Sequence, residues 1–408
     1  MPKKVSRKII IIGGGPAGLM AAQNLLKLGH RVSLYEAKPS LARKFQLAGR
    51  GGLNLTHSEP IGHFTEKYFE NSSFFASLFD RFSPQDLRNF CHQLGQDTFV
   101  GSSGRVFPKK FKATELLRAW ISNLVTMGLD IHTRHKWVGF DDNNNFLISD
   151  LHGEIKTVIP DAAILALGGA SWPRMGSDGS WVDILRKLDI EIAPLKPANC
   201  GFETTWPDSM PTSCFGHPLK NISVSLKDKS VKGEIMLSSY GLEGGAIYAL
   251  SKMIREEIEA TNNAKIHIDL KPSHSLGKIE QLITSRKPGT SLSRFLKHNV
   301  HISSPALELL KAYSSKEQFN SPTPLAKLIK GLEISLVKPR PIERAISTAG
   351  GIKFSSCDES LMLKARPGLF VAGEMLDWEA PTGGYLLQGC FSMAVHVASG
   401  VEQYLTSQ

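Results

Sequence analysis

The chain has 408 residues, of which 41% are hydrophobic and 21% are charged, and its formal net charge is +10. These fractions are ordinary for a globular protein, and the length allows two or three domains with a large core. No apolar stretch approaches the length of a membrane span, which excludes an integral membrane protein, and we expect no membrane partner.

The five cysteines give no sign of a disulfide framework or a metal site. Their number is odd, no pair has C-x-x-C spacing, and no Cys/His cluster of zinc type is present. We therefore expect no metal and a reducing, cytoplasmic location. The basic N-terminus and the apolar run after it mimic a signal peptide, but the glycine turn and amphipathic helix that follow explain that run better.

The positive charge is spread along the chain, and only the N-terminal basic residues and short pairs such as Lys109–Lys110 cluster. A solvated basic surface, or attraction to anionic cofactors and substrates, accounts for this charge. A face that binds nucleic acid is the alternative. Because no basic tract interleaved with aromatic residues stands out, we expect a small-molecule substrate and no nucleic-acid partner.

The segment Arg7–Ala37 predicts a strand, a glycine turn, a helix and a second strand. Ile9–Ile12 is a continuous β-branched run, typical of a strand buried on both faces of a parallel sheet. Gly13, Gly15 and Gly18 then follow with G-x-G-x-x-G spacing. The first glycine permits a tight turn, the second lets a pyrophosphate approach the backbone, and the third lets the helix lie close to the strand.

Glu36 ends the second strand, about twenty residues after the glycines, as a dinucleotide fingerprint requires. Its carboxylate can accept hydrogen bonds from ribose hydroxyls and would repel a 2′-phosphate. A pyrophosphate at the helix start would gain from the free N–H groups and the helix dipole. An ordinary βαβ unit with a glycine-rich turn is the alternative, and the order of all four features disfavours it.

Three further glycine-rich segments are expected to reach the same ligand. Residues 41–59 are too rich in glycine for a regular helix, and we expect them to wrap the cofactor rather than to form a surface loop, with Lys44 and Arg50 balancing phosphate charge. A buried strand that begins at Ala162 runs into Gly168–Gly169 at the carboxyl edge of the sheet, where ligands bind in open α/β folds.

The third segment lies near the C-terminus. Leu369–Ala372 predicts a last sheet strand, ended by Gly373 and Glu374, and Gly384 precedes an apolar helix over Tyr385–Val401. The N-terminus of that helix can direct N–H groups at an anionic or carbonyl-rich ligand edge and would raise the reduction potential of a flavin. Two distant glycine motifs that close on one ligand favour FAD over NAD.

The middle of the chain lacks the alternation of strands and helices. We expect an FAD-binding domain over 1–193 and 343–408. A β-rich inserted domain is expected over 194–251, a helical insertion over 252–321, and a return through the β-rich domain over 322–342.

These motifs together resemble the BaiN/YhiN-type bacterial flavoproteins. The matching stretches include IIGGGPAGLMAA, KFQLAGRGGLNLTH, ALGGASWPRMGSDG and AGEMLDWEAPTGGYLLQG, and they extend over essentially the whole chain. The resemblance implies an α/β fold: a Rossmann-like FAD-binding domain of glutathione-reductase type, interrupted by a β-barrel-like domain with a helical insertion. It also implies an FAD-dependent oxidoreductase, NAD(P)H-linked, without a defined substrate.

The expected FAD contacts follow from the fingerprint, the later glycine motifs and the resemblance. The strand near Val138 is expected to run beside the adenine. The expected contacts are Gly13, Gly15, Pro16, Ala17, Gly18, Glu36, Ala37, Lys44, Arg50, Gly51, Gly52, Asn54, Val138, Ala166, Gly168, Gly169, Gly373, Glu374, Gly384, Tyr385, Leu386 and Leu387.

No catalytic residue is identified from the sequence. Arg50, His57, Arg105 and Lys112 lie in segments expected to face the cleft, but for each of them alone a structural role is favoured over a catalytic one. A second complete G-x-G-x-x-G is missing, so either NAD(P)H visits the flavin transiently or electrons come from another source. The main hypothesis is hydride transfer from NAD(P)H through FAD to a small organic substrate. The alternatives are a flavin-dependent RNA-modifying enzyme and a flavin-binding sensor.

Overall fold

The computed structural model of the chain describes residues 6–49 and 52–408 and divides into two compact units. Unit 1 comprises the chain up to Lys196 together with Ser347–Gln408, and unit 2 is Pro197–Ile346. The chain leaves unit 1 along β11 (Ile192–Ala198) and returns along β19 (Ser347–Ile352), and these strands pair in a two-stranded sheet.

A five-stranded parallel sheet forms the centre of unit 1, with strand order β20-β10-β1-β2-β6. The four isoleucines of its central strand are at most 2% exposed, which confirms the prediction of a strand buried on both faces. The strands are β1 (Lys8–Ile12), β2 (Arg31–Glu36), β6 (Asp130–Thr133), β10 (Ala162–Leu165) and β20 (Leu369–Val371).

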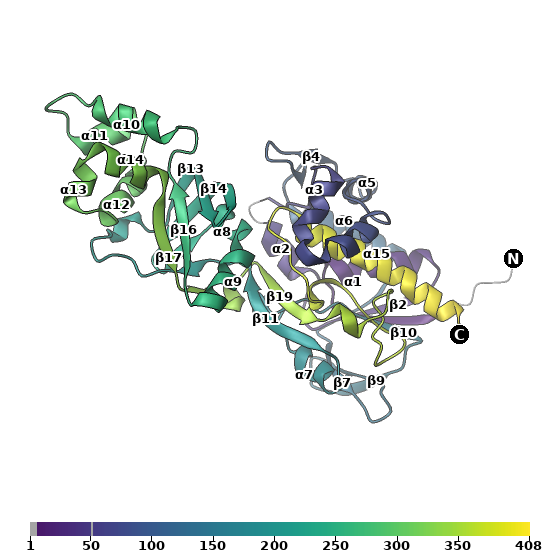
Figure 1. Ribbon diagram of the computed structural model, residues 1–408. Coiled ribbons are helices and arrows are strands. Elements are labelled where there is room, and N and C mark those ends of the chain that lie inside the picture. The colour runs from purple at the N-terminus through teal and green to yellow at the C-terminus, as the bar shows by residue number, and fades with distance from the viewer. Residues whose placement is uncertain (1–5, 50–51) are drawn as a thin grey trace. The chain divides into compact units, whose positions relative to one another are not determined.

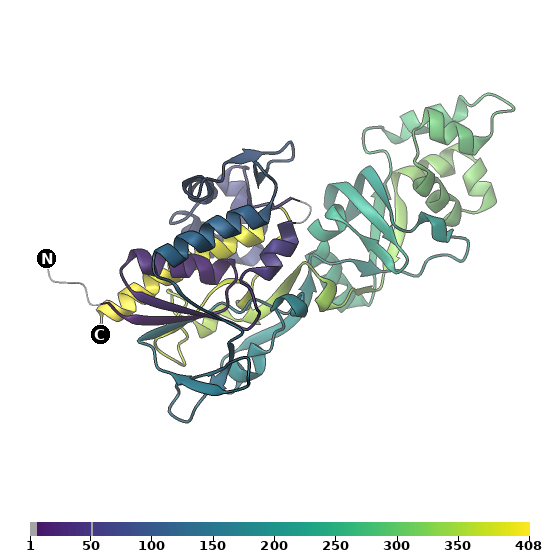
Figure 2. The same ribbon diagram turned by 180° about the vertical axis from the view of Figure 1, so that it is seen from behind.

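Three helices cover one face of this sheet: α1 (Pro16–Lys27), α6 (Ala113–Thr126) and α15 (Tyr385–Thr406) (Figures 1 and 2). Trp120 of α6 joins them, because its Nε1 donates to Gln23 Oε1 of α1 at 2.7 Å and its ring packs against Phe391 of α15. A three-stranded antiparallel meander lies on the other face. Its strands are β7 (Lys136–Phe140), β8 (Phe146–Ser149) and β9 (Ile155–Val158).

The segment between β2 and α6 contains one helix that the sequence did not predict. α2 spans Arg43–Ala48, inside the stretch judged too rich in glycine, because the glycines begin only at Gly49 and the six residues before it all tolerate a helix. The other elements are β3 (Thr56–His57), α3 (Ile61–Thr65), a 3-10 helix (Glu66–Asn71), α4 (Ser72–Phe79), α5 (Pro84–Gln93) and a hairpin of β4 (Thr98–Val100) with β5 (Arg105–Pro108). α7 (Trp181–Arg186) follows β10.

Unit 2 is built on a seven-stranded antiparallel sheet, the near-barrel expected for the inserted domain. Its order is β17-β16-β13-β14-β15-β12-β18, and Phe202, Ile235 and Ile266 are fully buried in its core. The strands are β12 (Phe202–Glu203), β13 (His217–Leu226), β14 (Lys229–Ser238), β15 (Gly241–Glu243), β16 (Ala264–Asp269), β17 (Leu332–Leu336) and β18 (Lys338–Pro339).

The helices of unit 2 are α8 (Gly245–Ala249), α9 (Ser251–Thr261), α10 (Leu276–Thr284), α11 (Leu292–Asn299), α12 (Ser304–Ala312), α13 (Lys316–Asn320) and α14 (Pro322–Lys330). The expected helical insertion over 252–321 is wrong in two places. Strand β16 interrupts it, because Ile266 and Ile268 alternate with exposed residues. α14 continues the helices past 321, with Leu325 and Ile329 on its buried face.

The glycine turn yields a stability prediction. A Cβ at Gly18 would lie 2.0 Å from the carbonyl oxygen of Gly13, so Gly18→Ala must push α1 away from β1. We expect a loss of about 1–3 kcal/mol in the free energy of unfolding, measured by urea denaturation of the cofactor-free protein. Gly62→Ala is the control, since no atom lies within 4 Å of its Cβ position. Equal stability of the two variants would contradict the prediction.

Candidate functional site

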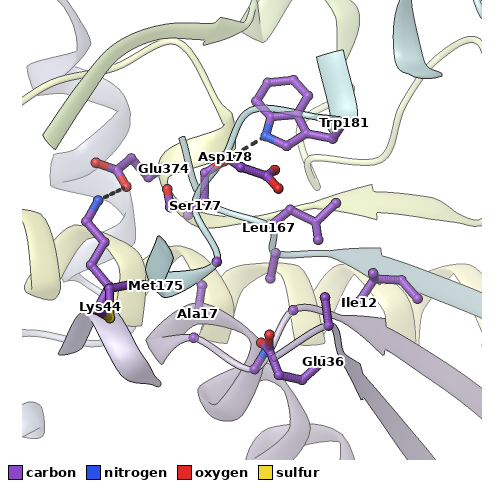
Figure 3. A pocket seen from close by; sticks show the side chains of 18 of the residues that line it. Ile12, Ala17, Glu36, Lys44, Leu167, Met175, Ser177, Asp178, Trp181 and Glu374 are labelled. Carbon is purple, nitrogen blue, oxygen red and sulfur yellow. Dashed lines mark hydrogen bonds and ion pairs between the residues drawn. The ribbon is translucent and has the colours of Figure 1, made fainter. Parts of the chain in front are cut away.

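A groove opens at the carboxyl ends of β1, β2, β10 and β20, where doubly wound sheets bind ligands (Figure 3). It holds about 1010 Å³ of empty space, a volume that includes the solvent at its mouth. Its walls come from segments far apart in the sequence: the glycine turn, the end of β2 with α2, the loop after β10, and the residues after β20.

The glycine turn places the N-terminus of α1 at this groove. Gly13 has φ +107°, and a Cβ there would lie 2.3 Å from the carbonyl oxygen of Ala166, so only glycine fits. Gly15 differs, because nothing lies within 4 Å of its Cβ position. α1 has no side-chain N-cap and no acidic residue in its first turn. Its first N–H groups therefore remain available to an anion.

Glu36 lines the groove with its carboxylate held by two backbone donors. Gly14 N–H donates to Oε2 at 2.9 Å, and Lys38 N–H donates to Oε1 at 2.7 Å. Burial raises the pKa of Glu36, while the N–H groups of Lys38 and Gly14 act in the opposite direction. Each oxygen keeps a free lone pair, so the fixed carboxyl group can accept further hydrogen bonds from a ligand's hydroxyl groups.

An ion pair lies in another part of the groove (Figure 3). Lys44 Nζ donates to Glu374 Oε2 at 2.7 Å and to Ser171 Oγ at 2.6 Å. Glu374 Oε1 in turn accepts a hydrogen bond from Thr348 N–H at 2.9 Å. The network joins α2, the loop after β10 and the turn after β20, so the groove presents a fixed cation and a fixed anion.

Two side chains in the wall of the groove, Ser177 and Cys390, bear on its chemistry. Ser177 Oγ is buried and has no hydrogen-bond partner within residues 6–49 and 52–408, which fits a site that expects a polar ligand. Cys390 also lines the groove, and burial raises the pKa of its thiol to about 12, with the charge of Glu374 acting in the same direction. This thiol is therefore neutral near pH 7 and is a poor nucleophile.

The structure gathers eleven of the predicted contact residues in this groove. They are Gly13, Gly15, Pro16, Ala17, Glu36, Ala37, Lys44, Ala166, Gly168, Gly373 and Glu374. Groove residues that the sequence did not indicate include Met175, Ser177, Trp181 and Cys390. The glycines of the GSDG segment were the available signal for Ser177, and Trp181 lies just beyond them, its Nε1 donating to the carbonyl of Gly168 at 2.8 Å.

Other predicted contacts lie outside the groove. Gly18 packs α1 against the turn, and a Cβ at Gly169 would lie 2.3 Å from Thr348 Oγ1. In β7, Lys136 and Trp137 line the groove, whereas Val138 does not and is 38% exposed. The remaining predicted residues outside it are Gly52, Asn54, Gly384, Tyr385, Leu386 and Leu387. Arg50 and Gly51 lie outside the described residues.

The N-terminus of α15 packs onto β3 instead of lining the groove. Gly384 has φ +96°, and its Cβ position is 2.5 Å from Thr56 Cα. Tyr385 is buried and its hydroxyl donates to Glu59, while its ring stacks on His57 at 5.5 Å. Asn54 Oδ1 and Thr56 Oγ1 are buried without a partner in the described parts of the chain. These two oxygens form a second set of polar atoms suited to a ligand.

Of the other candidate residues, His57 of β3 lies opposite Arg105 of β5 in the antiparallel register, and Lys112 precedes α6. None of the three lines the groove. In the part of the chain that the structure describes, no three His, Cys, Asp or Glu side chains gather to hold a metal ion. No helix there combines the length and the apolar character needed to cross a membrane.

The parallel sheet with its glycine turn, interrupted by an antiparallel near-barrel domain, is the Rossmann FAD-binding fold of flavoprotein oxidoreductases. Within this class the chain belongs to the HI0933-like family, because the model of the HI0933-like protein Rossmann domain matches residues 7–400. The match confirms the resemblance to the BaiN/YhiN type.

Two curated relatives match along almost their whole length. The chain is 22% identical over 413 residues to a 3-dehydro-bile acid delta(4,6)-reductase of Clostridium scindens, covering 93% of this chain and 95% of the relative. It is 23% identical over 411 residues to a ribosomal RNA dihydrouridine synthase of Haemophilus influenzae, covering 97% and 98%.

Solved structures support the fold. 3-Ketosteroid delta1-dehydrogenase of Sterolibacterium denitrificans aligns with a TM-score of 0.54 at 10% identity, covering 98% of this chain and 100% of that one. 3-Ketosteroid-delta4-(5alpha)-dehydrogenase of Rhodococcus jostii aligns with a TM-score of 0.50 at 13% identity, covering 99% and 98%. At these identities the likeness concerns the fold alone.

The open space at Gly15 gives a test of cofactor binding. Gly15→Ala should fold normally, because φ −81° suits alanine and no neighbour obstructs the methyl group. A pyrophosphate on the N-terminus of α1 would meet that methyl group, so we expect FAD affinity to fall about tenfold or more, equivalent to ~1.4 kcal/mol. Fluorescence titration of the apoprotein measures it, with Gly62→Ala as control. Unchanged affinity in Gly15→Ala would place the ligand elsewhere.

The ion pair in the groove gives a second test. Lys44→Met leaves Glu374 without its cationic partner, and we expect FAD affinity to fall roughly tenfold, as for the loss of a charge-assisted hydrogen bond. Lys110→Met is the matched control, since Lys110 also pairs with a carboxylate, Glu115, but lies at the surface. A similar loss of affinity in both variants would show that only the overall charge matters.

Proposed function

We propose that this protein is an FAD-dependent oxidoreductase that takes hydride from NAD(P)H and passes it to an organic substrate. One observation carries the proposal: a groove at the sheet's carboxyl edge combines a free helix N-terminus, a fixed carboxyl group at Glu36 and the Lys44–Glu374 pair. These are the groups that a dinucleotide requires for its phosphates and hydroxyls.

Different residues of the groove suit different parts of FAD. The N–H groups of α1 and the close approach at Gly15 suit the pyrophosphate, and Glu36 suits the ribose of the adenosine. Lys44 and Glu374 offer a donor and an acceptor for the remaining polar part of the cofactor. When bound, FAD supplies two-electron hydride chemistry, and the protein contributes position and charge.

The state of the cysteines supports direct transfer of hydride from the flavin to the substrate, without a redox-active cysteine pair between them. All five are unpaired in the described chain, and burial raises the pKa of Cys91, Cys357 and Cys390 to about 12. No thiolate is therefore ready beside the groove to form a disulfide with a second cysteine. Unpaired cysteines also fit the cytoplasm, where we place the reaction.

The names of the two curated relatives support a carbon–carbon double bond as the acceptor. Both describe reductions, one of a bile acid and the other forming dihydrouridine, in which a ring double bond of uridine is saturated. We propose that this protein likewise delivers hydride to a double bond conjugated with a carbonyl group. A small molecule is the first candidate substrate.

A base in RNA is the second candidate, because unit 2 carries a concentrated positive charge. Residues 276–330 contain nine Lys or Arg and three Asp or Glu, a formal charge of +6 within a chain of +10. Polyanions are attracted by such a region, whereas a small apolar substrate gains nothing from it.

Anaerobic reduction tests the proposed function. We expect the purified protein to be yellow, and its flavin absorbance to bleach with NADH or NADPH. It should recover on addition of a conjugated enone or of uridine-containing RNA, but not of the saturated analogue. Protein that stays colourless after FAD is added would refute the proposal. Bleached flavin that no acceptor reoxidises would favour the sensor.

A further inference from the structure

Unit 2 contains a basic segment, residues 281–307, without any Asp or Glu. It holds Arg286, Lys287, Arg294 and Lys297, two histidines and seven Ser or Thr residues. The segment runs from the end of α10 through α11 to the start of α12, helices that the figures show together in unit 2 (Figure 1). Arginine, lysine and hydroxyl side chains are those that proteins use to contact nucleic-acid phosphates.

α11 presents its basic residues on one face. Leu292, Phe295 and Leu296 are at most 9% exposed and form the buried side of the helix. Arg294, Lys297 and His298 are exposed, and their spacing of three and four residues places them side by side. Because the apolar side is already buried in the core of unit 2, α11 has no apolar face left to insert into a membrane.

The cations of this face are not neutralised within the protein. Lys287, Arg294 and Lys297 have no acidic partner within 4.0 Å among the described residues. Elsewhere in unit 2 carboxylates accompany the exposed lysines: Lys227 pairs with Glu257 and Lys265 with Glu333, and the hairpin of β13 and β14 also carries Asp228 and Glu234. Residues 281–307 differ from these parts of unit 2 because no carboxylate accompanies their cations.

We propose that α11 and the preceding loop, residues 285–298, form a docking surface for the phosphate backbone of RNA. The surface itself is independent of the flavin groove, whereas the choice of RNA over DNA rests on the second candidate substrate proposed above. Three cations without an acidic partner, two on α11 and one in the preceding loop, suit successive phosphates, and the neighbouring hydroxyl groups add neutral donors. The proposed surface is an alternative to the expectation, drawn from the sequence, of dispersed charge without a nucleic-acid partner.

Charge removal on this surface tests the inference. The variant Lys287→Gln/Arg294→Gln/Lys297→Gln is compared with Lys220→Gln/Lys229→Gln/Lys232→Gln, whose three lysines are exposed on β13 and β14 of the same unit. Both lose three charges. The probe is a fluorescent stem-loop RNA with uridines in its loop, measured by anisotropy with the full-length holoprotein.

We expect the α11 variant to bind this RNA roughly 10- to 100-fold more weakly at low salt, and the slope of log Kd against log salt to fall by about two. The control variant should stay within about threefold of the unchanged protein. Flavin content and bleaching by NAD(P)H should be equal in all three proteins, so a failed RNA result is distinguishable from a failed flavin assignment.

Several outcomes would overturn the inference. These are no binding of RNA by the unchanged protein at low salt, equal losses in the two variants, and α11-dependent binding of phosphatidylserine vesicles or polyglutamate in preference to RNA. Equally tight binding of a DNA duplex, with the same dependence on α11, would keep a phosphate-binding surface but overturn the assignment to RNA.

Discussion

The close packing of α1 on β1 is the constraint on which the groove at the carboxyl edge of the sheet depends. The carbonyl oxygen of Gly13 occupies the place where a side chain at residue 18 would begin, and this contact fixes the direction of α1. The helix N-terminus consequently points into the space between β1, β2 and β10. Glu36, Lys44 and Glu374 can converge on one ligand only because this direction is set first.

Charge and hydrogen bonding then connect segments that lie far apart in the sequence. Glu374 accepts hydrogen bonds from Lys44 and from the backbone of Thr348, so the turn after the last strand is tied to α2 and to β19. A cofactor bound in the groove would compete for some of the hydrogen-bonding groups of this network and would satisfy others. Binding and the ordering of unit 1 are therefore expected to be coupled, because ligands that bind only the folded state stabilise it.

The sequence predicts the parts of this fold that local periodicity determines. The N-terminal βαβ unit, Glu36, the glycine-ended strand β10 and the serine-capped helices of unit 2 follow from patterns within short windows. Strand β16 was missed because its six residues lie between charged helices. The packing of Gly384 against Thr56 could not be predicted, since the partner is distant in the sequence and no local pattern encodes it.

The same distinction applies to the site. Some residues that glycine spacing indicates, such as Gly15 and Gly168, lie in the groove, whereas Gly18, Gly169 and the predicted contacts over 384–387 do not. A glycine pair before a helix predicts a positive φ, and Gly384 has one, but it does not say what fills the space beside it. The polar wall atoms, Ser177 among them, become visible only when burial and hydrogen bonding are known in three dimensions.

The adjacent strands β11 and β19 carry the whole of unit 2 out of unit 1 and back again. Because the chain leaves and re-enters unit 1 along adjacent strands, the whole inserted unit can be exchanged during evolution without a change in the path of the chain through unit 1. One FAD-binding unit can in this way be combined with different inserted units, each joined at the same pair of strands and suited to a chemically different substrate. The two relatives named for a bile acid and for ribosomal RNA align with 93% and 97% of this chain, which includes residues of both units.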